Sequence, residues 1–128
     1  MEALENKLTK IQSLLAALTF SMALVTPFSA MAVGAIAVDD EAGSTDAGFA
    51  VVTGYDSESA AKAAALKECR AAGNESCKVA VWFKTCGAYA ASSEHYGIGY
   101  GNTQQIAQSK AVEDCGGGSC KVLVSDCE

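Results

Sequence analysis

The chain has 128 residues, a formal net charge of −6, and nine basic residues that are scattered along its length. A protein that binds nucleic acid usually carries a basic stripe, and one held at a membrane by charge carries a polybasic patch. Neither pattern is present, so the sequence predicts no nucleic-acid partner and no membrane partner for the mature protein.

The first predicted element is an export signal. Lys7 and Lys10 precede an apolar run over residues 11–25, and the small residues at 30–32 suit a signal peptidase. Cleavage is expected after Ala32. The alternative is an uncleaved membrane anchor, but the run is shorter than the roughly 20 apolar residues that a spanning helix needs.

Removal of residues 1–32 leaves a mature chain, 33–128, that is predicted to be a single domain in the periplasm or outside the cell. A domain of this size is marginal on hydrophobic burial alone, and disulfides commonly supply the difference in an oxidising compartment. All six cysteines lie in this part of the chain. Three disulfides and no free thiol are therefore expected.

The first half of the mature chain, 33–86, predicts two strands, a helix and a third strand. The strands are expected over 34–37, 49–54 and 77–81, where small and β-branched residues are grouped. The helix lies between the second and third strands. Its predicted start is Ser57, whose hydroxyl suits an N-cap.

The second half, 87–128, repeats this order. Strands are expected over 87–90, 96–101 and 120–124, and a helix begins after Thr103. Together the two halves predict an α+β fold made of two repeated β-β-α-β units with pseudo-two-fold symmetry, stapled by disulfides.

Each predicted helix has a face of small residues, and one strand of the second half has such a face as well. Alternate residues of a strand share one face, so the glycines over 96–101 are expected to let an alanine-faced helix approach closely. The residues concerned are Ala61, Ala65, Ala107 and Ala111 in the helices and Gly97, Gly99 and Gly101 in the strand.

Alternation also assigns the side chains of the segment 78–84 to two faces. Val79, Val81 and Phe83 are expected on one face. The opposite face then carries Lys78, Ala80, Trp82 and Lys84.

The cysteine spacing predicts the disulfide pairing. Cys77 and Cys86 bracket a predicted strand whose ends lie ~30 Å apart at ~3.3 Å per residue, far beyond the ~7 Å limit between bridged Cα atoms. The same reasoning separates Cys120 from Cys127. The repeat then suggests one local bridge in each half and a third bridge between the halves. The predicted pairs are Cys69–Cys77, Cys115–Cys120 and Cys86–Cys127.

Two motifs lie in the first half, Ala-Leu-x-x-Cys at 65–69 and Cys-Lys-Val-x-Val-Trp-Phe at 77–83, and a third, Cys-Gly-Ala-x-Ala at 86–90, begins the second half. Together they resemble the bacterial family known as domain of unknown function 4189. The resemblance spans nearly all of the mature chain and accommodates all six cysteines. It implies an exported bacterial domain with a repeated β-β-α-β unit and no agreed activity, and some members are discussed as secreted effectors.

The second half departs from these motifs in its last strand, where Ser125 and Asp126 stand in place of Trp82 and Phe83. The aromatic pair therefore occurs once. An exposed tryptophan beside lysines suits a protein interface, whereas the alternative is that Trp82 covers a disulfide or the edge of the other repeat. The candidate interface comprises Trp82, Lys78, Lys84, Tyr96 and Tyr100.

The sequence offers few candidates for catalysis. His95 is the single histidine, and an arrangement of Ser92, His95 and Asp46 lacks the G-x-S-x-G elbow of many serine hydrolases. Glu94 and a second carboxylate would provide the pair that glycosidases use, but no spacing singles out such a pair.

Metal and cofactor sites are not expected either. The acidic segment 39–46 offers oxygen ligands for Ca²⁺ but does not fit the EF-hand loop, and the cysteines lack the C-x-x-C spacing of zinc sites. The glycines over 97–101 alternate within a strand and so differ from the G-x-G-x-x-G of dinucleotide-binding proteins.

The preferred function is a non-catalytic domain that binds another protein, as a secreted effector, inhibitor or envelope factor. The alternative is a small secreted hydrolase that uses carboxylates or His95.

Overall fold

The computed structural model describes residues 32–128. In chain order its elements are β1 (Val33–Asp39), the short 3-10 helix η1 (Ser44–Asp46), β2 (Gly48–Tyr55), α2 (Glu58–Ala71), β3 (Lys78–Phe83), β4 (Cys86–Ala91), β5 (Tyr96–Gly101), α3 (Gln104–Cys115) and β6 (Lys121–Cys127). The predicted export signal covers residues 1–32. Residues 1–31 lie outside the described part of the chain, which begins at Ala32.

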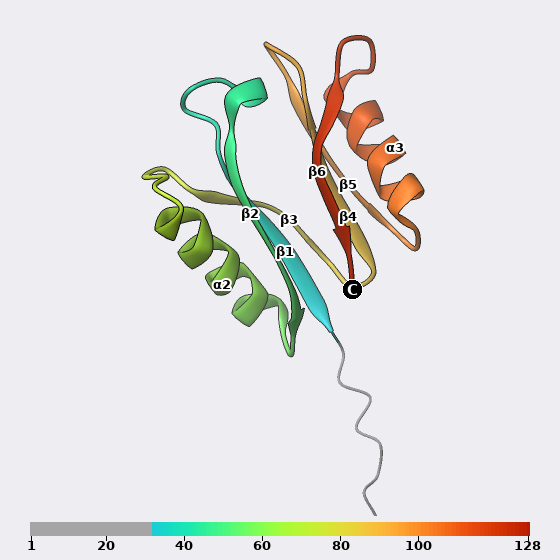
Figure 1. The fold of residues 1–128 in the computed structure, drawn as a ribbon. Helices are drawn as coiled ribbons and strands as arrows, with labels where there is room; N and C mark the ends of the chain where they lie inside the picture. The colour runs from blue at the N-terminus through green and yellow to red at the C-terminus, as the bar shows by residue number, and fades with distance from the viewer. Residues whose placement is uncertain (1–31) are drawn as a thin grey trace, which may run out of the picture.

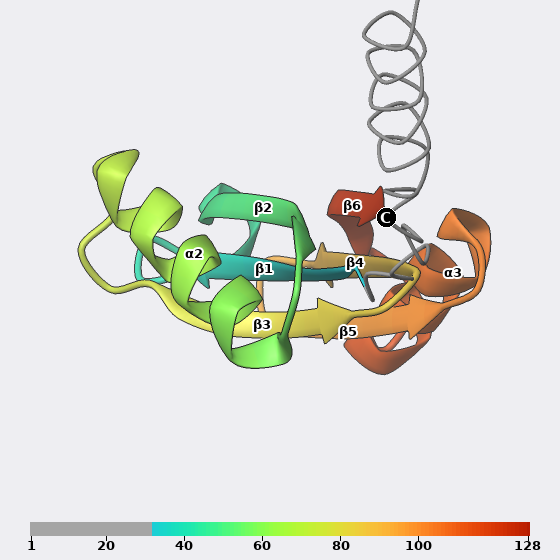
Figure 2. The ribbon, with the colours of Figure 1, turned by 90° about the horizontal axis from the view of Figure 1, so that it is seen from below.

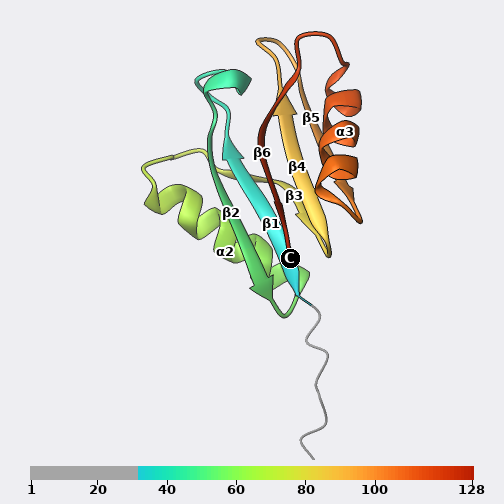
Figure 3. The same ribbon diagram turned by 45° about the vertical axis from the view of Figure 1, so that its right-hand side comes forward.

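The six strands form two antiparallel sheets of three strands, with the orders β2-β1-β3 and β5-β4-β6. The first strand of each half is thus the central strand of its sheet. Figure 1 shows α2 and α3 on the two outer sides of the molecule with the sheets between them, and Figure 3 shows the same layers after a turn. The mixed α+β class predicted from the sequence is confirmed.

Three apolar clusters hold these layers together. One lies between α2 and the first sheet, a second between the two sheets, and a third between the second sheet and α3. The largest buried side chains belong to the cluster between the sheets, where Tyr89, Phe83 and Ile36 are at most 2 % exposed. The two outer clusters consist mainly of alanine, valine and cysteine, which brings each helix close to its sheet.

The helices begin where the sequence predicts. The hydroxyl of Ser57 accepts a hydrogen bond from the N–H of Ala60, and that of Thr103 accepts one from the N–H of Ile106. Both are N-cap contacts that satisfy a free donor of the first turn.

The close approach predicted for α3 is also confirmed. A Cβ atom on Gly97 would lie 2.3 Å from the carbonyl oxygen of Ala111, and one on Gly99 would lie 2.1 Å from that of Ala107. These are backbone atoms of α3, so no side-chain movement relieves the overlap. Glycine is therefore required at both positions for the observed spacing between α3 and β5.

The predicted faces of β3 are partly wrong because this strand contains a bulge. Its pairing with β1 shifts between Ile36, which pairs with Val81, and Ala37, which pairs with Val79. Ala80 is the extra residue, and one extra residue reverses the faces of everything before it. Val79 thus lies opposite Ala37 of the α2-side cluster, on the face away from Val81.

The six cysteines form the same three pairs that the repeat suggests: Cys69–Cys77, Cys86–Cys127 and Cys115–Cys120. Two pairs connect the end of a helix to the start of the following strand. The third joins directly opposite residues of β4 and β6. Because β4 begins at Cys86, the bridge lies within the second sheet, whereas a link between the two repeats was expected.

Candidate functional site

The five candidate interface residues lie in two groups, one at each end of β3 and β5. These strands are the edges of different sheets and run along the same side of the molecule (Figure 2). Lys78 and Tyr96 begin the two strands. Trp82, Lys84 and Tyr100 lie at or just beyond their ends.

At the first end, the side chain of Lys78 bridges the two sheets. Its ammonium group lies 3.1 Å from the carboxylate of Asp40 and 5.1 Å from the centre of the Tyr96 ring. The bulge at Ala80 explains this placement, since it turns Lys78 to the face opposite Trp82. Lys78 and Tyr96 therefore lie apart from Trp82, at the other end of the two strands.

Beneath this contact, Tyr96 stacks on the buried Tyr89 with ring centres 5.9 Å apart. The hydroxyl of Tyr89 is buried, and among the described residues it has no hydrogen-bond partner. Burial, and then the negative charges of Asp40 and ionised Tyr96, raise the pKa of Tyr89 to about 12. The phenol is therefore neutral at ordinary pH and contributes packing rather than acid–base chemistry.

At the second end, a groove of about 400 Å³ opens where β3 turns into β4. It lies at the end of the molecule where Figure 1 shows the C-terminus. Its residues come from both halves of the chain. They are Trp82, Phe83, Lys84, Thr85, Cys86, Tyr100, Gly101 and Asn102.

The groove combines a fixed floor with exposed walls. Phe83 and Cys86 are buried, whereas Lys84, Thr85 and Asn102 are exposed and Tyr100 is 62 % exposed. Trp82 is half-buried and packs against the cluster that contains Cys69. Trp82 thus covers part of the α2-side cluster and also lines the groove.

The corresponding place in the second half has a different chemistry. Ser125 pairs with Ala88 as Trp82 pairs with Ala35. The Ser125 hydroxyl accepts hydrogen bonds from the amides of Gln104 and Gln108, at 2.8 and 2.7 Å. Polar contacts to α3 therefore replace an aromatic wall at this position.

The residues proposed for catalysis make structural contacts. The Ser92 hydroxyl accepts a hydrogen bond at 3.1 Å from the backbone N–H of His95, and the N–H of Ser92 donates to the His95 carbonyl at 2.7 Å. These bonds close the hairpin between β4 and β5. Asp46 belongs to η1, in a connection of the other sheet.

Several carboxylates are likewise bonded to the backbone. Asp114 accepts a hydrogen bond at 2.9 Å from the N–H of Ile98, and Glu128 accepts one at 2.9 Å from the N–H of Gly54. Ile98 and Gly54 lie on β5 and β2, which are edge strands. Edge strands expose unpaired donors that invite further strand pairing, and these two carboxylates satisfy one donor on each edge.

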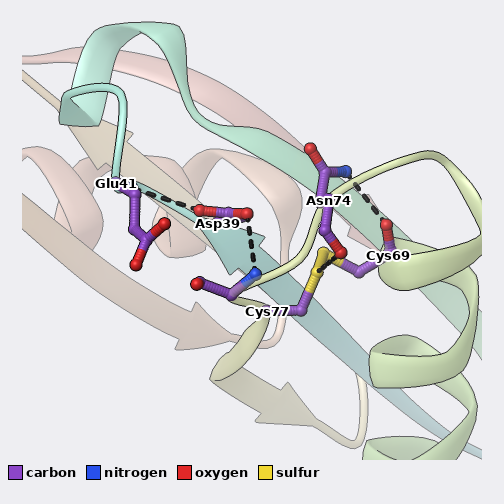
Figure 4. The surroundings of a disulfide bond; sticks show 6 residues. Asp39, Glu41, Cys69, Asn74 and Cys77 are labelled. Atoms are coloured by element: carbon purple, nitrogen blue, oxygen red, sulfur yellow. Dashed lines mark hydrogen bonds between the residues drawn. A yellow bond between two sulfur atoms is a disulfide. The ribbon is translucent and has the colours of Figure 1, made fainter.

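The acidic segment after β1 is held in the same way (Figure 4). The carboxylate of Asp39 accepts hydrogen bonds from the N–H groups of Ser76 and Glu41, which lower the pKa of Asp39. The side-chain amide of Asn74 donates to the carbonyl of Cys69 at 3.0 Å, beside the Cys69–Cys77 disulfide. This network ties the end of β1 to the loop before β3.

Within residues 32–128, no cluster of three or more histidine, cysteine, aspartate or glutamate side chains is arranged to hold a metal ion. In the same range, no helix has both the length and the apolar character needed to cross a membrane. The groove, where side chains of both halves meet, is the candidate functional site. Thr85 and Asn102 were missed by sequence reasoning because both are turn residues whose proximity depends on how β3 and β5 meet.

Residues 33–127 match the family described as "Domain of unknown function (DUF4189)". This chain belongs to that family. It is also similar to "Protein Rv1269c" of Mycobacterium tuberculosis (strain H37Rv) and to "Protein Mb1300c" of Mycobacterium bovis. Each is 41% identical over 64 residues, which cover 50% of this chain and 49% of the relative. The chain thus spans about half the length of these curated relatives. No solved structure matches it.

Proposed function

We propose that this protein is an exported, disulfide-stapled domain that binds another protein through the groove at the end of β3 and acts without catalysis. The observation that carries the proposal is the composition of the groove. Aromatic side chains from both halves, Trp82 and Tyr100, stand beside an exposed lysine over a buried floor. Tryptophan and tyrosine are enriched among the residues that dominate binding energy at protein interfaces.

The same proposal holds that the fold is a duplicated β-β-α-β unit with pseudo-two-fold symmetry. Its support is the equal order of elements and the equal order of strands in the two sheets. Gly34 pairs with Phe83 as Gly87 pairs with Asp126. Divergence at the last strand then leaves one aromatic site in each molecule.

Export is proposed on the basis of the N-terminal pattern and the disulfides. The signal would be removed after Ala32, directly before β1 begins at Val33. Three disulfides are typical of a domain that resides in an oxidising compartment. Intact-mass measurement of protein recovered from the envelope or the medium tests this, and a species that retains Met1 contradicts it.

The binding proposal is tested by capture with the purified exported protein, followed by identification, purification and rebinding of the captured partner. Trp82→Ala is expected to weaken rebinding about 30-fold, since truncation of a central interface tryptophan costs ~2 kcal/mol or more. Tyr55→Ala is the matched control. Tyr55 packs against the same apolar cluster as Trp82 but does not line the groove.

Equal weakening by the two substitutions would show that stability, and not the groove, controls binding. A screen of the same protein with ester, peptide and glycoside substrates tests for hydrolysis. Turnover that disappears in His95→Ala, with folding unchanged, would replace the proposed binding function with the hydrolase alternative.

A further inference from the structure

The groove combines aromatic walls with one positively charged side chain. Lys84 is the single charged side chain among the lining residues, and it has donors but no acceptor. Thr85, Tyr100 and Asn102 donate as well as accept. Among residues 32–128, no carboxylate belongs to the lining of the groove. A complementary ligand therefore offers acceptors and a negative charge to Lys84.

A proline-rich segment with acidic residues meets each of these requirements. Proline has no N–H group, so such a segment presents carbonyl acceptors without matching donors. It adopts the extended polyproline II conformation, in which the backbone makes no internal hydrogen bonds, and it docks on grooves lined by aromatic side chains. Trp82 and Tyr100 provide such walls, and Phe83 lies between them and the interior.

On the basis of the proposed function, we propose that the partner is a protein with an acidic, proline-rich segment that binds in the polyproline II conformation between Trp82 and Tyr100. An acidic residue of that segment pairs with Lys84. The rest of the domain is acidic, with a net charge of −6 for the whole chain. Lys84 is the charged side chain among the residues that line the groove, so an acidic residue of the ligand meets it there.

Addition of a strand to the sheet fits the structure less well. The edge strand β3 carries a bulge at Ala80 and is flanked by Lys78 and Lys84, and bulges and lysines are devices that protect edges from pairing. On β5, the carboxylate of Asp114 already accepts the hydrogen bond from Ile98.

A glycan fits less well for a different reason. The hydroxyls of a neutral glycan can bond to Thr85, Tyr100 and Asn102, but they carry no negative charge to pair with Lys84.

Trp82 is the only tryptophan of the chain, so its fluorescence reports directly on the groove. The probe is a blocked synthetic peptide with a run of prolines followed by glutamates. Two matched peptides replace the prolines by serines or the glutamates by glutamines, and a chitin oligosaccharide serves as the glycan probe. Saturable change in Trp82 emission is expected with the acidic proline peptide, and at least about tenfold weaker binding with each matched peptide.

Lys84→Glu is expected to weaken binding of the acidic proline peptide at least about tenfold. Lys67→Glu makes the same change in net charge on the exposed surface of α2 and is expected to leave binding unchanged. Added salt should reduce the difference between the glutamate and glutamine peptides, because screening acts on exposed charges.

The other outcomes overturn the inference. Equal binding of the serine peptide, preferential binding of the oligosaccharide, or emission that changes with protein concentration alone through self-association would each identify a different occupant. Absence of peptide binding, together with partner capture that still depends on Trp82, refutes the inference about the ligand and leaves the proposed function in place. Capture that is unaffected by Trp82→Ala refutes the proposed function itself.

Discussion

Replacement of two neighbours on β3 by alanine separates the roles of core and groove. Phe83 is 2 % exposed in the cluster between the sheets. Its ring fills the space beside two glycines, since a Cβ on Gly34 or Gly87 would lie 2.4 or 2.3 Å from a ring atom. Phe83→Ala therefore leaves a cavity at the junction of the sheets and is expected to cost about 4 kcal/mol of unfolding free energy.

Trp82 points to the opposite face of the strand, where it is half-buried against the α2-side cluster. Full burial would make Trp82→Ala as costly as a core substitution, ~3–5 kcal/mol. With about half of that burial, the expected loss is roughly 2 kcal/mol. Since 1 kcal/mol lowers the melting temperature by ~4–8 °C in a domain of this size, Trp82→Ala should lower it by roughly 8–16 °C and Phe83→Ala by about twice as much.

The assay is thermal and urea unfolding followed by circular dichroism, with the disulfides intact, combined with partner capture below the melting temperature. Trp82→Ala should lose more binding than its stability loss explains. Equal destabilisation by the two substitutions, or a larger effect of Trp82→Ala, would show that Trp82 is a core residue. In that case the groove would lose its main binding residue.

Three further predictions concern packing, disulfides and pH. Gly99→Ala should lower the free energy of unfolding by about 3 kcal/mol, because the new methyl group meets the backbone of α3. Gly101→Ala places its methyl group against a movable side chain and should lower that free energy less. Urea unfolding of both variants measures the difference. Cys127→Ser removes a disulfide with a sequence separation of 41, and Cys120→Ser removes one with a separation of 5. Calorimetry should therefore show that the free energy of unfolding falls by about 4 kcal/mol in Cys127→Ser and by about 2 kcal/mol in Cys120→Ser. Tyr89→Phe removes a buried hydroxyl and should add about 1 kcal/mol at neutral pH. Because the pKa of Tyr89 is raised from 10.0 to about 12, its contribution is complete below pH 10.0 and is lost as the pH rises through about 12. The Tyr89→Phe protein should therefore lose less stability over that alkaline range, and an identical pH profile would contradict the assignment.

Local patterns in the sequence were sufficient for much of the architecture. The N-caps at Ser57 and Thr103 and the alanine-rich helix faces have short-range causes, and the structure confirms both. The glycines of β5 were equally informative, because alternation alone predicts that they share the face covered by a helix.

Reasoning from alternation was wrong where pairing between strands departs from a regular register. The bulge at Ala80 depends on how β3 fits against β1, and it moves Lys78 away from Trp82 and toward Tyr96. The role of the Cys86–Cys127 bridge was also misjudged, since it joins paired residues of one sheet.

The sequence by itself determined the α+β class, the order of the elements and the inward faces of the helices, because these follow from spacing within segments. It also determined the cysteine pairs, through strand length and the repeated pattern. Only the tertiary structure decided which aromatic and basic residues meet. Trp82 and Tyr100 are brought together by two edge strands of different sheets. That meeting depends on the packing of the sheets through Phe83 and its glycine neighbours, which no local pattern specifies.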